Sequence, residues 1–246
     1  DTVIVPIGGG GLISGVATAI KAVAPRVRVI GVQAHAAPGS AQSWRSGAIT
    51  NVAARPTIAD GIAAGAPGAV TLPLMRQLVD DIVLVDEDEI AQAIVLLLER
   101  SKLVVEGAGA VGVAAVMARK LDLTGRNTVI VLSGGNIDLQ RLARVVEHGL
   151  TEMGRYYSLT IGLDDKPGQL AMLSALIADT GANVLSLDHH RFGIAMSIGR
   201  VQVALLLEVR NRAHAAEVGA ALEAHGFMRG RAGEPTFMPK SWERDD

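Results

Sequence analysis

The sequence predicts an α/β protein in two parts, a mostly parallel sheet with its helices followed by a smaller βαββαβ unit. Of the 246 residues, 49% are apolar but only 3% are aromatic, so the core must consist mainly of Ala, Val, Ile and Leu, as is typical of α/β proteins. Strand-like and helix-like segments alternate over the first 150 residues, which predicts right-handed crossovers between parallel strands. Beyond Gly154 apolar residues recur at every second position, which indicates a half-buried strand.

The first part is expected to begin with a buried strand and to end with a helix that starts at Asp138. The expected strands are residues 3–7, 27–32, 82–85 and 128–132, and the last of them is fully apolar. Helices are expected at residues 12–24, around Trp44 and at residues 108–120. Asp86 and Glu89 form a D-x-x-E capping box, which predicts the start of one more helix.

The second part has the element order strand, helix, strand, strand, helix, strand. Its strands are expected at residues 157–163, 184–190, 201–209 and near Phe227, with residues 192–199 as a connection. Pro167 is expected as the first residue of a helix that ends at Gly181, and residues 213–224 form the second helix. This is the ferredoxin-like order. We therefore expect domains at residues 1–150 and 154–228, followed by a tail at 229–246.

Composition and charge exclude several classes of partner and chemistry. A formal net charge of -2 gives no reason to expect nucleic acid or an anionic membrane. The sequence has no cysteine, which excludes disulfides, Cys-ligated zinc and thiol catalysis. No 20-residue apolar run and no signal-peptide pattern are found, and we expect a cytoplasmic protein. A buried first strand without an initiator Met predicts a C-terminal fragment of a longer protein.

Four consecutive glycines separate the first strand from the first helix: Gly8, Gly9, Gly10 and Gly11. With no Cβ in the turn, backbone N–H groups can converge on an anion at the positive end of the helix. We expect a phosphate there, and the alternative is a tight turn without a ligand. The spacing G-x-G-x-x-G fails in every register, because Leu12, Ile13 or Ser14 occupies a required glycine position, and no G-K-[ST] follows. A dinucleotide or a nucleoside triphosphate is therefore disfavoured.

A second glycine-rich turn, Ser133-Gly134-Gly135-Asn136, directly follows the strand expected at residues 128–132, which we expect to be buried. Ser133 would lie at the carboxyl end of a parallel strand, where α/β proteins place ligands, and its hydroxyl can donate or accept a hydrogen bond. Two other roles stay open. Ser133 can be a nucleophile, which needs a histidine base, although neither His35 nor His148 has a telling context. It can also be the N-cap of the next helix.

Four segments occur in one order and at family-like separations. They are Val5-Pro6-Ile7-Gly8-Gly9-Gly10-Gly11-Leu12-Ile13-Ser14-Gly15, Thr57-Ile58-Ala59-Asp60-Gly61, Val105-Glu106-Gly107-Ala108-Gly109-Ala110 and Leu132-Ser133-Gly134-Gly135-Asn136-Ile137-Asp138. Together they resemble the threonine ammonia-lyase and serine racemase branch of the fold type II pyridoxal-phosphate (PLP) enzymes, which have a tryptophan synthase β-like fold. The resemblance covers about residues 1–150, and it implies that this part is a portion of the catalytic domain.

The resemblance implies a role for each candidate residue. The glycine turn, residues 8–11, would hold the PLP phosphate, and Gly61 would lie beside the cofactor. Ser133 would hydrogen-bond the pyridine nitrogen, which a neutral hydroxyl leaves largely unprotonated. Glu106 would face the active-site cavity near the substrate, and the alternative is a helix-start carboxylate stabilised by the helix dipole.

The sequence departs from the family pattern in two respects. In several relatives a Glu and an Asp after the second strand help to bind a cation, whereas Gln33 and Gly39 stand at the aligned positions, so no divalent metal site is expected. The family attaches PLP to a lysine in a Ser-x-Lys-x-Arg-Gly-type context upstream of the glycine turn. The lysines here lack this context, and we expect the chain alone to be inactive. They are Lys21, Lys102, Lys120, Lys166 and Lys240.

Residues 154–228 resemble the ACT-type regulatory domain that is fused to many threonine ammonia-lyases. The matching features are Asp165-Lys166-Pro167-Gly168-Gln169-Leu170 and Gly181-Ala182-Asn183-Val184. A Pro-Gly loop at a helix N-terminus offers free N–H groups to a carboxylate. We therefore expect Asp165, Gly168 and Asn183 to contact an amino-acid effector, and the alternative is a dimerisation module without a ligand. Adjacent His189 and His190 would point to opposite faces of a strand, which indicates exposed residues and no shared metal.

These resemblances imply PLP-dependent deamination of L-threonine to 2-oxobutanoate and ammonia, in isoleucine biosynthesis or threonine catabolism, with regulation by an amino acid. A homo-oligomer is expected. Two alternatives stay open. One is a dehydratase or racemase of the same family that acts on L-serine, and the other is a non-catalytic fragment that senses amino acids.

Overall fold

The computed structural model describes residues 1–190 and 199–229, which form two compact units, Asp1–Gly149 and the part from Leu150 onward. The first unit alternates strands and helices along the chain. Its elements are β1 (Thr2–Pro6), α1 (Gly11–Val23), β2 (Arg28–Ala34), α2 (Gly39–Ser46), η1 (Asp60–Ile62), α3 (Thr71–Leu78), β3 (Asp81–Val85), α4 (Glu87–Leu96), the π-helical η2 (Leu97–Ser101), α5 (Gly107–Met117), β4 (Thr128–Ile130) and α6 (Leu139–Glu152), which crosses into the second unit.

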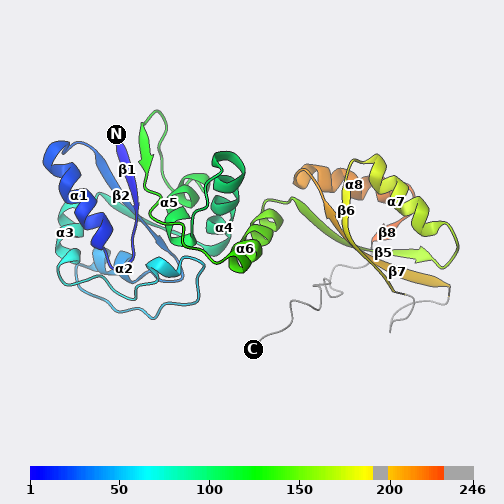
Figure 1. The fold of residues 1–246 in the computed structure, drawn as a ribbon, viewed down its shortest axis with the longest axis horizontal. Coiled ribbons are helices and arrows are strands. Elements are labelled where there is room, and N and C mark those ends of the chain that lie inside the picture. Colours follow the sequence, from blue (N-terminus) through cyan, green and yellow to red (C-terminus); the bar gives the residue numbers. More distant parts are fainter. Residues whose placement is uncertain (191–198, 230–246) are drawn as a thin grey trace. The chain divides into compact units, whose positions relative to one another are not determined.

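The first unit contains a four-stranded parallel sheet in the order β3-β2-β1-β4. Strand β1 lies inside the sheet, with Ile4 opposite Ile30 of β2 and Ile130 of β4. Helices cover both faces (Figure 1). The parallel sheet predicted from the alternation of strands and helices is therefore confirmed.

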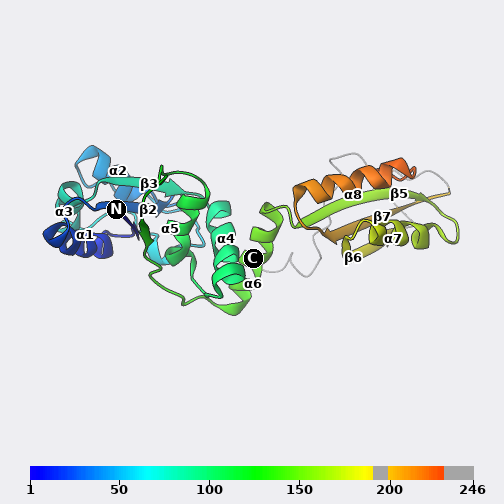
Figure 2. The ribbon, with the colours of Figure 1, turned by 90° about the horizontal axis from the view of Figure 1, so that it is seen from above.

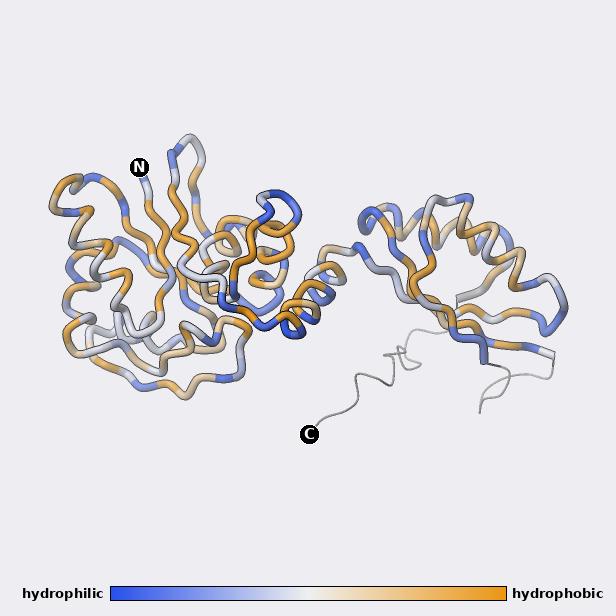
Figure 3. The backbone as a smooth tube through the Cα atoms, viewed as in Figure 1, coloured by the Kyte–Doolittle hydropathy of each residue, from blue (hydrophilic) through white to orange (hydrophobic). Residues whose placement is uncertain are grey.

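Successive side chains of these strands enter two different cores. Ile4 and Ile30 pack with helices α4 and α5, whereas Val5 and Val29 pack with α1, α2 and α3. Figure 3, in which the chain is coloured by the hydropathy of each residue, shows runs of hydrophobic residues along these strands. Because both faces are covered, the strands read as continuous apolar runs rather than as an alternating pattern.

Acidic caps define the starts of α4 and α6. Asp86 Oδ1 accepts the Glu89 N–H at 2.9 Å and Glu89 Oε2 accepts the Asp86 N–H at 2.9 Å, so the predicted capping box is confirmed. Asp138 Oδ1 accepts the N–H groups of Gln140 and Arg141 at 2.9 and 3.1 Å. Asp138, and not Ser133, is therefore the residue that caps α6.

Two predictions about the first unit are wrong. Strand β4 is not buried, since Val129 is 62% exposed, because β4 lies at the sheet edge and pairs with β1 alone among the described strands. The helix expected to reach Lys120 ends at Met117, and Arg119 adopts a φ of 54° in the left-handed region. Lys120 instead pairs with Glu89 of α4 at 2.8 Å.

The second unit has the expected βαββαβ order. Its elements are β5 (Tyr156–Asp164), α7 (Gln169–Asp179), β6 (Asn183–His190), β7 (Arg200–Glu208), α8 (Arg212–Ala224) and β8 (Met228–Arg229). The strands form an antiparallel sheet in the order β6-β7-β5-β8. Alternate residues of β5, beginning with Leu159, are buried, and helices α7 and α8 lie side by side over the sheet (Figure 2).

Pro167 is not the first helical residue, which corrects the prediction. Gly168 adopts a φ of 89° and separates Pro167 from helix α7, because the left-handed conformation cannot continue a right-handed helix. Leu170 is 37% exposed, so the apolar stripe of α7 begins only at Leu173. His189 and His190 are exposed, as expected.

Residues 191–198 and 230–246 lie outside the described residues, and with them most of the predicted connection at 192–199 and of the predicted tail. Within the described residues, no helix combines the length and the apolar character that crossing a membrane requires.

The packing of Gly31 in β2 yields a stability prediction. A Cβ at Gly31 would lie 2.1 Å from Ile7 Cδ1 and 3.0 Å from Ile13 Cδ1, so Gly31→Ala should lower the free energy of unfolding by about 1–3 kcal/mol through overpacking. Gly15→Ala is the matched control, because a Cβ at this exposed position of α1 meets nothing within 4 Å. The control should gain about 0.5–1 kcal/mol. Urea denaturation measures both, and equal effects would contradict the close packing.

Candidate active site

The two glycine-rich turns leave the sheet at the same edge. Strands β1 and β4 are parallel neighbours with Thr2 opposite Thr128 and Ile4 opposite Ile130, so the turns that follow them share the carboxyl edge. Because β2 and β3 lie on the other side of β1, the chain changes direction between β1 and β4. α/β proteins form their ligand crevice at such a switch point.

The glycine turn has its carbonyl groups occupied and its N–H groups free. The carbonyl oxygen of Gly8 accepts a hydrogen bond from Ser40 Oγ at 2.6 Å. That of Gly9 accepts one from Thr71 Oγ1 at 2.7 Å. Among the described residues, the N–H groups of Gly8, Gly9 and Gly10 have no acceptor. Buried or half-buried N–H groups normally find a partner, so this arrangement fits an anion.

The space above the turn is open. A Cβ at Gly9 or Gly11 would meet nothing within 4 Å. Gly10 caps α1 with a φ of 90°, a left-handed conformation that favours glycine. Free N–H groups at the start of a helix together with open space suit the phosphate group of PLP.

Glu106 lies between two other turns. A Cβ at Gly134 would lie 2.1 Å from Glu106 Oε1, and one at Gly61 would lie 3.8 Å from the same atom. The Glu106 N–H donates to Gly134 O at 3.2 Å. Glu106 is the N-cap residue of α5, but its side chain makes no capping hydrogen bond. This position at the helix start fits the alternative of a carboxylate stabilised by the helix dipole, which needs no capping hydrogen bond.

The Gly61 turn also approaches the glycine turn. A Cβ at Gly8 would lie 3.2 Å from the Cα of Ile62. A Cβ at Gly61 would lie 3.1 Å from the Cβ of Ala108, near the start of α5. The structure thus brings together the predicted residues of the first unit from four segments that are distant in the sequence.

Ser133 is exposed at this edge. With Asp138 as the cap of α6, its N-cap role is excluded. The His35 Nδ1 atom lies 3.4 Å from Arg55 Nη2, and the His148 Nε2 atom lies 2.6 Å from Asp88 Oδ1. Among the described residues, neither histidine is hydrogen-bonded to Ser133. The geometry leaves the hydroxyl available to a ligand.

Two residues that were not predicted from the sequence, Glu87 and Arg141, hold the Gly61 turn. Glu87 accepts a hydrogen bond from Thr57 Oγ1 at 2.6 Å, and Arg141 forms an ion pair with Asp60. The hydrogen bond from Arg141 is the main cause that holds the pKa of the Asp60 carboxyl below its usual value. The sequence feature that could have indicated Glu87 and Arg141 is their position in the first turn of a helix with an acidic cap, Asp86 for α4 and Asp138 for α6.

The positions aligned with the cation ligands of relatives have structural roles here. Gln33 is fully buried, and its Oε1 accepts the Ala41 N–H at 2.9 Å. A Cβ at Gly39 would lie 1.9 Å from Gly65 O, so only glycine fits.

Each of the described lysines contacts a carboxylate or a backbone carbonyl. Their Nζ atoms contact Asp80 at 2.8 Å (Lys21), Glu99 O at 2.9 Å (Lys102), Glu89 at 2.8 Å (Lys120) and Asp164 at 3.4 Å (Lys166). Lys240 lies outside the described residues.

The three predicted effector residues do not come together within one copy of the chain. Asn183 lies opposite Glu208, at the end of the sheet where β5 begins. Asp165 and Gly168 follow the other end of β5, about 27 Å away at the usual rise of a strand. The prediction treated them as one site, but β5 and β6 run in the same direction on the two sides of β7, so the loop before α7 and the start of β6 lie at opposite ends.

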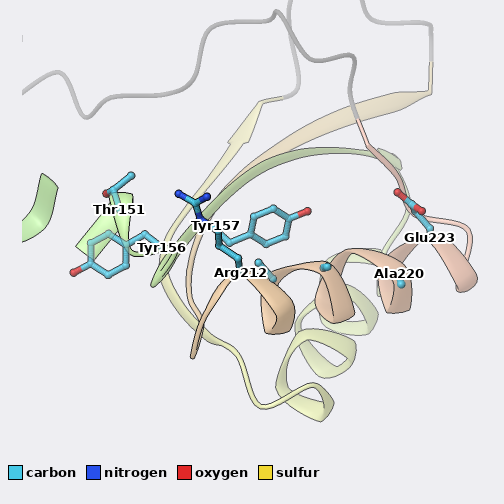
Figure 4. Close-up of a pocket in the computed structure, with 9 residues that line it drawn as sticks. Thr151, Tyr156, Tyr157, Arg212, Ala220 and Glu223 are labelled. Atoms are coloured by element: carbon cyan, nitrogen blue, oxygen red, sulfur yellow. The ribbon is translucent and has the colours of Figure 1, made fainter. Parts of the chain in front are cut away.

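A cavity of about 530 Å³ lies in the second unit, at the end where β5 begins (Figure 4). None of the predicted effector residues lines it. The lining residues are Thr151, Gly154, Tyr156, Tyr157, Arg212, Ala215, Ala216, Ala220 and Glu223.

Comparisons of the sequence with known proteins agree with this geometry. A profile of the family "Pyridoxal-phosphate dependent enzyme" matches residues 1–134. An L-threonine ammonia-lyase of Geobacter sulfurreducens is 50% identical over 227 residues, which cover 92% of this chain and 56% of that protein. A catabolic L-threonine dehydratase of Escherichia coli is 52% identical over 147 residues, which cover 59% of this chain and 45% of that protein.

Solved structures give the same result. The processed form of threonine deaminase isoform 2 from Solanum lycopersicum has a TM-score of 0.56 at 35% identity, covering 60% of this chain and 43% of that one. Maize serine racemase has a TM-score of 0.55 at 42% identity, covering 60% and 46%. The chain spans about half the length of the curated relatives it matches. Since the profile covers more than half of its residues, the chain belongs to the pyridoxal-phosphate dependent enzyme family.

Proposed function

We propose that the protein deaminates L-threonine to 2-oxobutanoate and ammonia with PLP as cofactor. The observation that carries this proposal is the meeting of a glycine turn with free N–H groups, the Ser133 turn and Glu106 at one sheet edge. The L-threonine ammonia-lyase and dehydratase names of relatives at 50% and 52% identity support the same substrate.

The chain's residues would hold the cofactor at its two ends. The N–H groups of residues 8–11 would bind the phosphate, and the Ser133 hydroxyl would hydrogen-bond the ring nitrogen. Bound PLP supplies an electron sink for the charge left at the substrate Cα when its proton is removed. We propose that none of the four described lysines holds PLP, since none stands in a Ser-x-Lys-x-Arg-Gly-type context and each contacts another group of the chain.

Glu106 is the candidate for proton transfer at the substrate's β-hydroxyl. This group needs one proton in order to leave as water. Asp60 is also an acid beside Gly61, but its carboxylate is paired with Arg141. The Glu106 carboxylate faces two glycines and makes no cap bond, so it is the acidic group available to the substrate.

A second candidate activity is dehydration or racemisation of L-serine. The observation in its favour is the likeness to maize serine racemase. These activities differ from threonine deamination in their products, since dehydration of L-serine yields pyruvate, and racemisation yields D-serine and no keto acid. The non-catalytic alternative, a fragment that only senses amino acids, predicts neither product.

The intact enzyme with PLP should release 2-oxobutanoate from L-threonine, and Glu106→Gln should lower kcat by about a hundred-fold or more, as expected for loss of a general acid. Chromatography or a coupled dehydrogenase assay measures the keto acid. The control is Glu217→Gln, an exposed position on α8 that should keep full activity. A Glu106→Gln enzyme as active as the control would refute the role of Glu106. In a parallel assay with L-serine as substrate, D-serine without keto acid would favour the racemase.

We also propose that the first unit is a portion of the catalytic domain, residues 1–150, and that residues 154–228 form an ACT-type regulatory domain. The βαββαβ order and the β6-β7-β5-β8 sheet support this assignment. Gly168 starts α7 without a side-chain cap and with open space beside it, which suits a ligand carboxylate. A ligand that touched Asp165, Gly168 and Asn183 together would lie between two copies, in keeping with a homo-oligomer.

Titration calorimetry of the whole chain with Ile, Val, Ser and Thr should detect binding of at least one of these amino acids. Asp165→Asn should weaken that binding by about ten-fold, as expected for loss of a charged hydrogen bond. Asp179→Asn at the exposed end of α7 is the control and should bind normally. If no amino acid binds, the second unit is a dimerisation module and its effector role is wrong.

A further inference from the structure

The segment Thr57–Gly61 connects the surroundings of Glu106 with those of the glycine turn. Its last residue, Gly61, approaches Glu106 and Ala108, and Ile62, which follows, approaches Gly8. A shift of this segment would therefore change both the phosphate end of the site and the surroundings of Glu106. The contacts that hold this segment in place therefore also determine the geometry of the site.

The N–H groups of this segment are not bound by backbone carbonyls within the described part of the chain. Among the described residues, no N–H group of residues 57–61 donates to a backbone carbonyl. The Ile58 N–H goes to the Glu87 carboxylate and the Ala59 N–H goes to Thr57 Oγ1 at 3.1 Å. Side chains thus accept these two N–H groups, while the short 3₁₀ helix η1 supplies backbone hydrogen bonds to the carbonyls of Ala59 and Asp60.

Glu87 holds the segment from helix α4. Its two carboxylate oxygens accept separate hydrogen bonds, Oε1 from Thr57 Oγ1 at 2.6 Å and Oε2 from the Ile58 N–H at 2.7 Å. Glu87 is the first residue of α4, where the helix dipole favours a negative charge. Its position is fixed by the capping box that starts the helix.

Arg141 holds the same segment from helix α6. Its Nη2 donates to Thr57 O at 2.9 Å, and its Nη1 forms the ion pair with Asp60. Arg141 stands in the first turn of α6, where its own N–H is bound by the cap Asp138. One guanidinium therefore spans both ends of the segment, a geometry that the planar fork of arginine suits and lysine does not.

The ion pair between Arg141 and Asp60 contributes little to the stability of the whole unit. The Arg141 and Asp60 side chains are 39% and 66% exposed, and exposed ion pairs are weak contributors to global stability. Arg141 and Glu87 also border a cavity of about 440 Å³ next to Thr57 and Ile58. Their effect should therefore be local, on the position of the segment.

We propose that Arg141 and Glu87 are positioning residues that hold Thr57–Gly61 against the glycine turn and Glu106, so that the cofactor site is formed before PLP binds. The proposal deepens the proposed function and rests on it for its effect on PLP. The hold on the segment itself is independent of that function.

Hydrogen exchange followed by mass spectrometry tests the hold on the segment in the chain without cofactor. In Arg141→Gln and Glu87→Gln, peptides covering residues 57–62 should exchange about ten- to a hundred-fold faster, because a charged hydrogen bond no longer closes the segment. Arg141→Lys should restore only part of the protection. The Tm should stay within about 3 °C of the parent.

Arg144→Gln is the matched control. Arg144 lies one turn later on α6, borders the same cavity and, among the described residues, makes no hydrogen bond or ion pair. The Arg144→Gln substitution removes the same charge from the same helix, and it should leave the hydrogen exchange of residues 57–62 unchanged. Unchanged exchange in Arg141→Gln, or an equal increase in Arg144→Gln, would overturn the proposal.

PLP affinity of the intact enzyme, measured by fluorescence titration, tests the consequence. It should fall by about ten-fold in Arg141→Gln and not in Arg144→Gln. If the parent enzyme binds PLP and Arg141→Gln binds it equally well, the positioning role is wrong. If the parent does not bind PLP, the proposed function fails, while the exchange result still decides whether Arg141 holds the segment.

Discussion

Strand β1 pairs in parallel with β2 on one side and with β4 on the other, and the candidate site depends on this central position. The pairing directs the turn after β1 and the turn after β4 to one edge, although residues 8 and 133 are far apart in the sequence. A parallel strand cannot fold back on its neighbour through a short turn, so long connections must pass over the faces. These connections bring the Gly61 and Glu106 segments to the same edge.

Close backbone approach then brings the site together. A Cβ at Gly107 would lie 2.2 Å from Ile58 O, and one at Gly134 would lie 2.1 Å from Glu106 Oε1. These glycines let three segments meet without side chains between them, which leaves their polar backbone groups to be satisfied by other means. Neighbouring helices satisfy part of them through charged side chains, as Glu87 does for Ile58. Rigid helices thus position an irregular segment.

The second unit follows a different physical rule. Strands β5 and β6 both pair antiparallel with β7 and therefore run in the same direction, with α7 returning the chain from the end of β5 to the start of β6. The loop before α7 therefore lies at the opposite end of the sheet from Asn183. One sheet face is covered by α7 and α8, and this explains the alternation of buried and half-buried residues along β5 and β7. The cavity bordered by Tyr156 and Arg212 is formed by α8, the start of β5 and the end of α6 with the turn that follows it.

The sequence by itself determined the elements, because periodicity, capping and glycine turns are local signals. The D-x-x-E box at Asp86 and the order of strands and helices were predicted in this way. Only the tertiary structure decided that β4 is an exposed edge and that Gly168 breaks the helix start expected at Pro167. It alone placed Arg141 on Asp60, 81 residues away, because such partners depend on how the helices pack around the sheet and not on any local pattern.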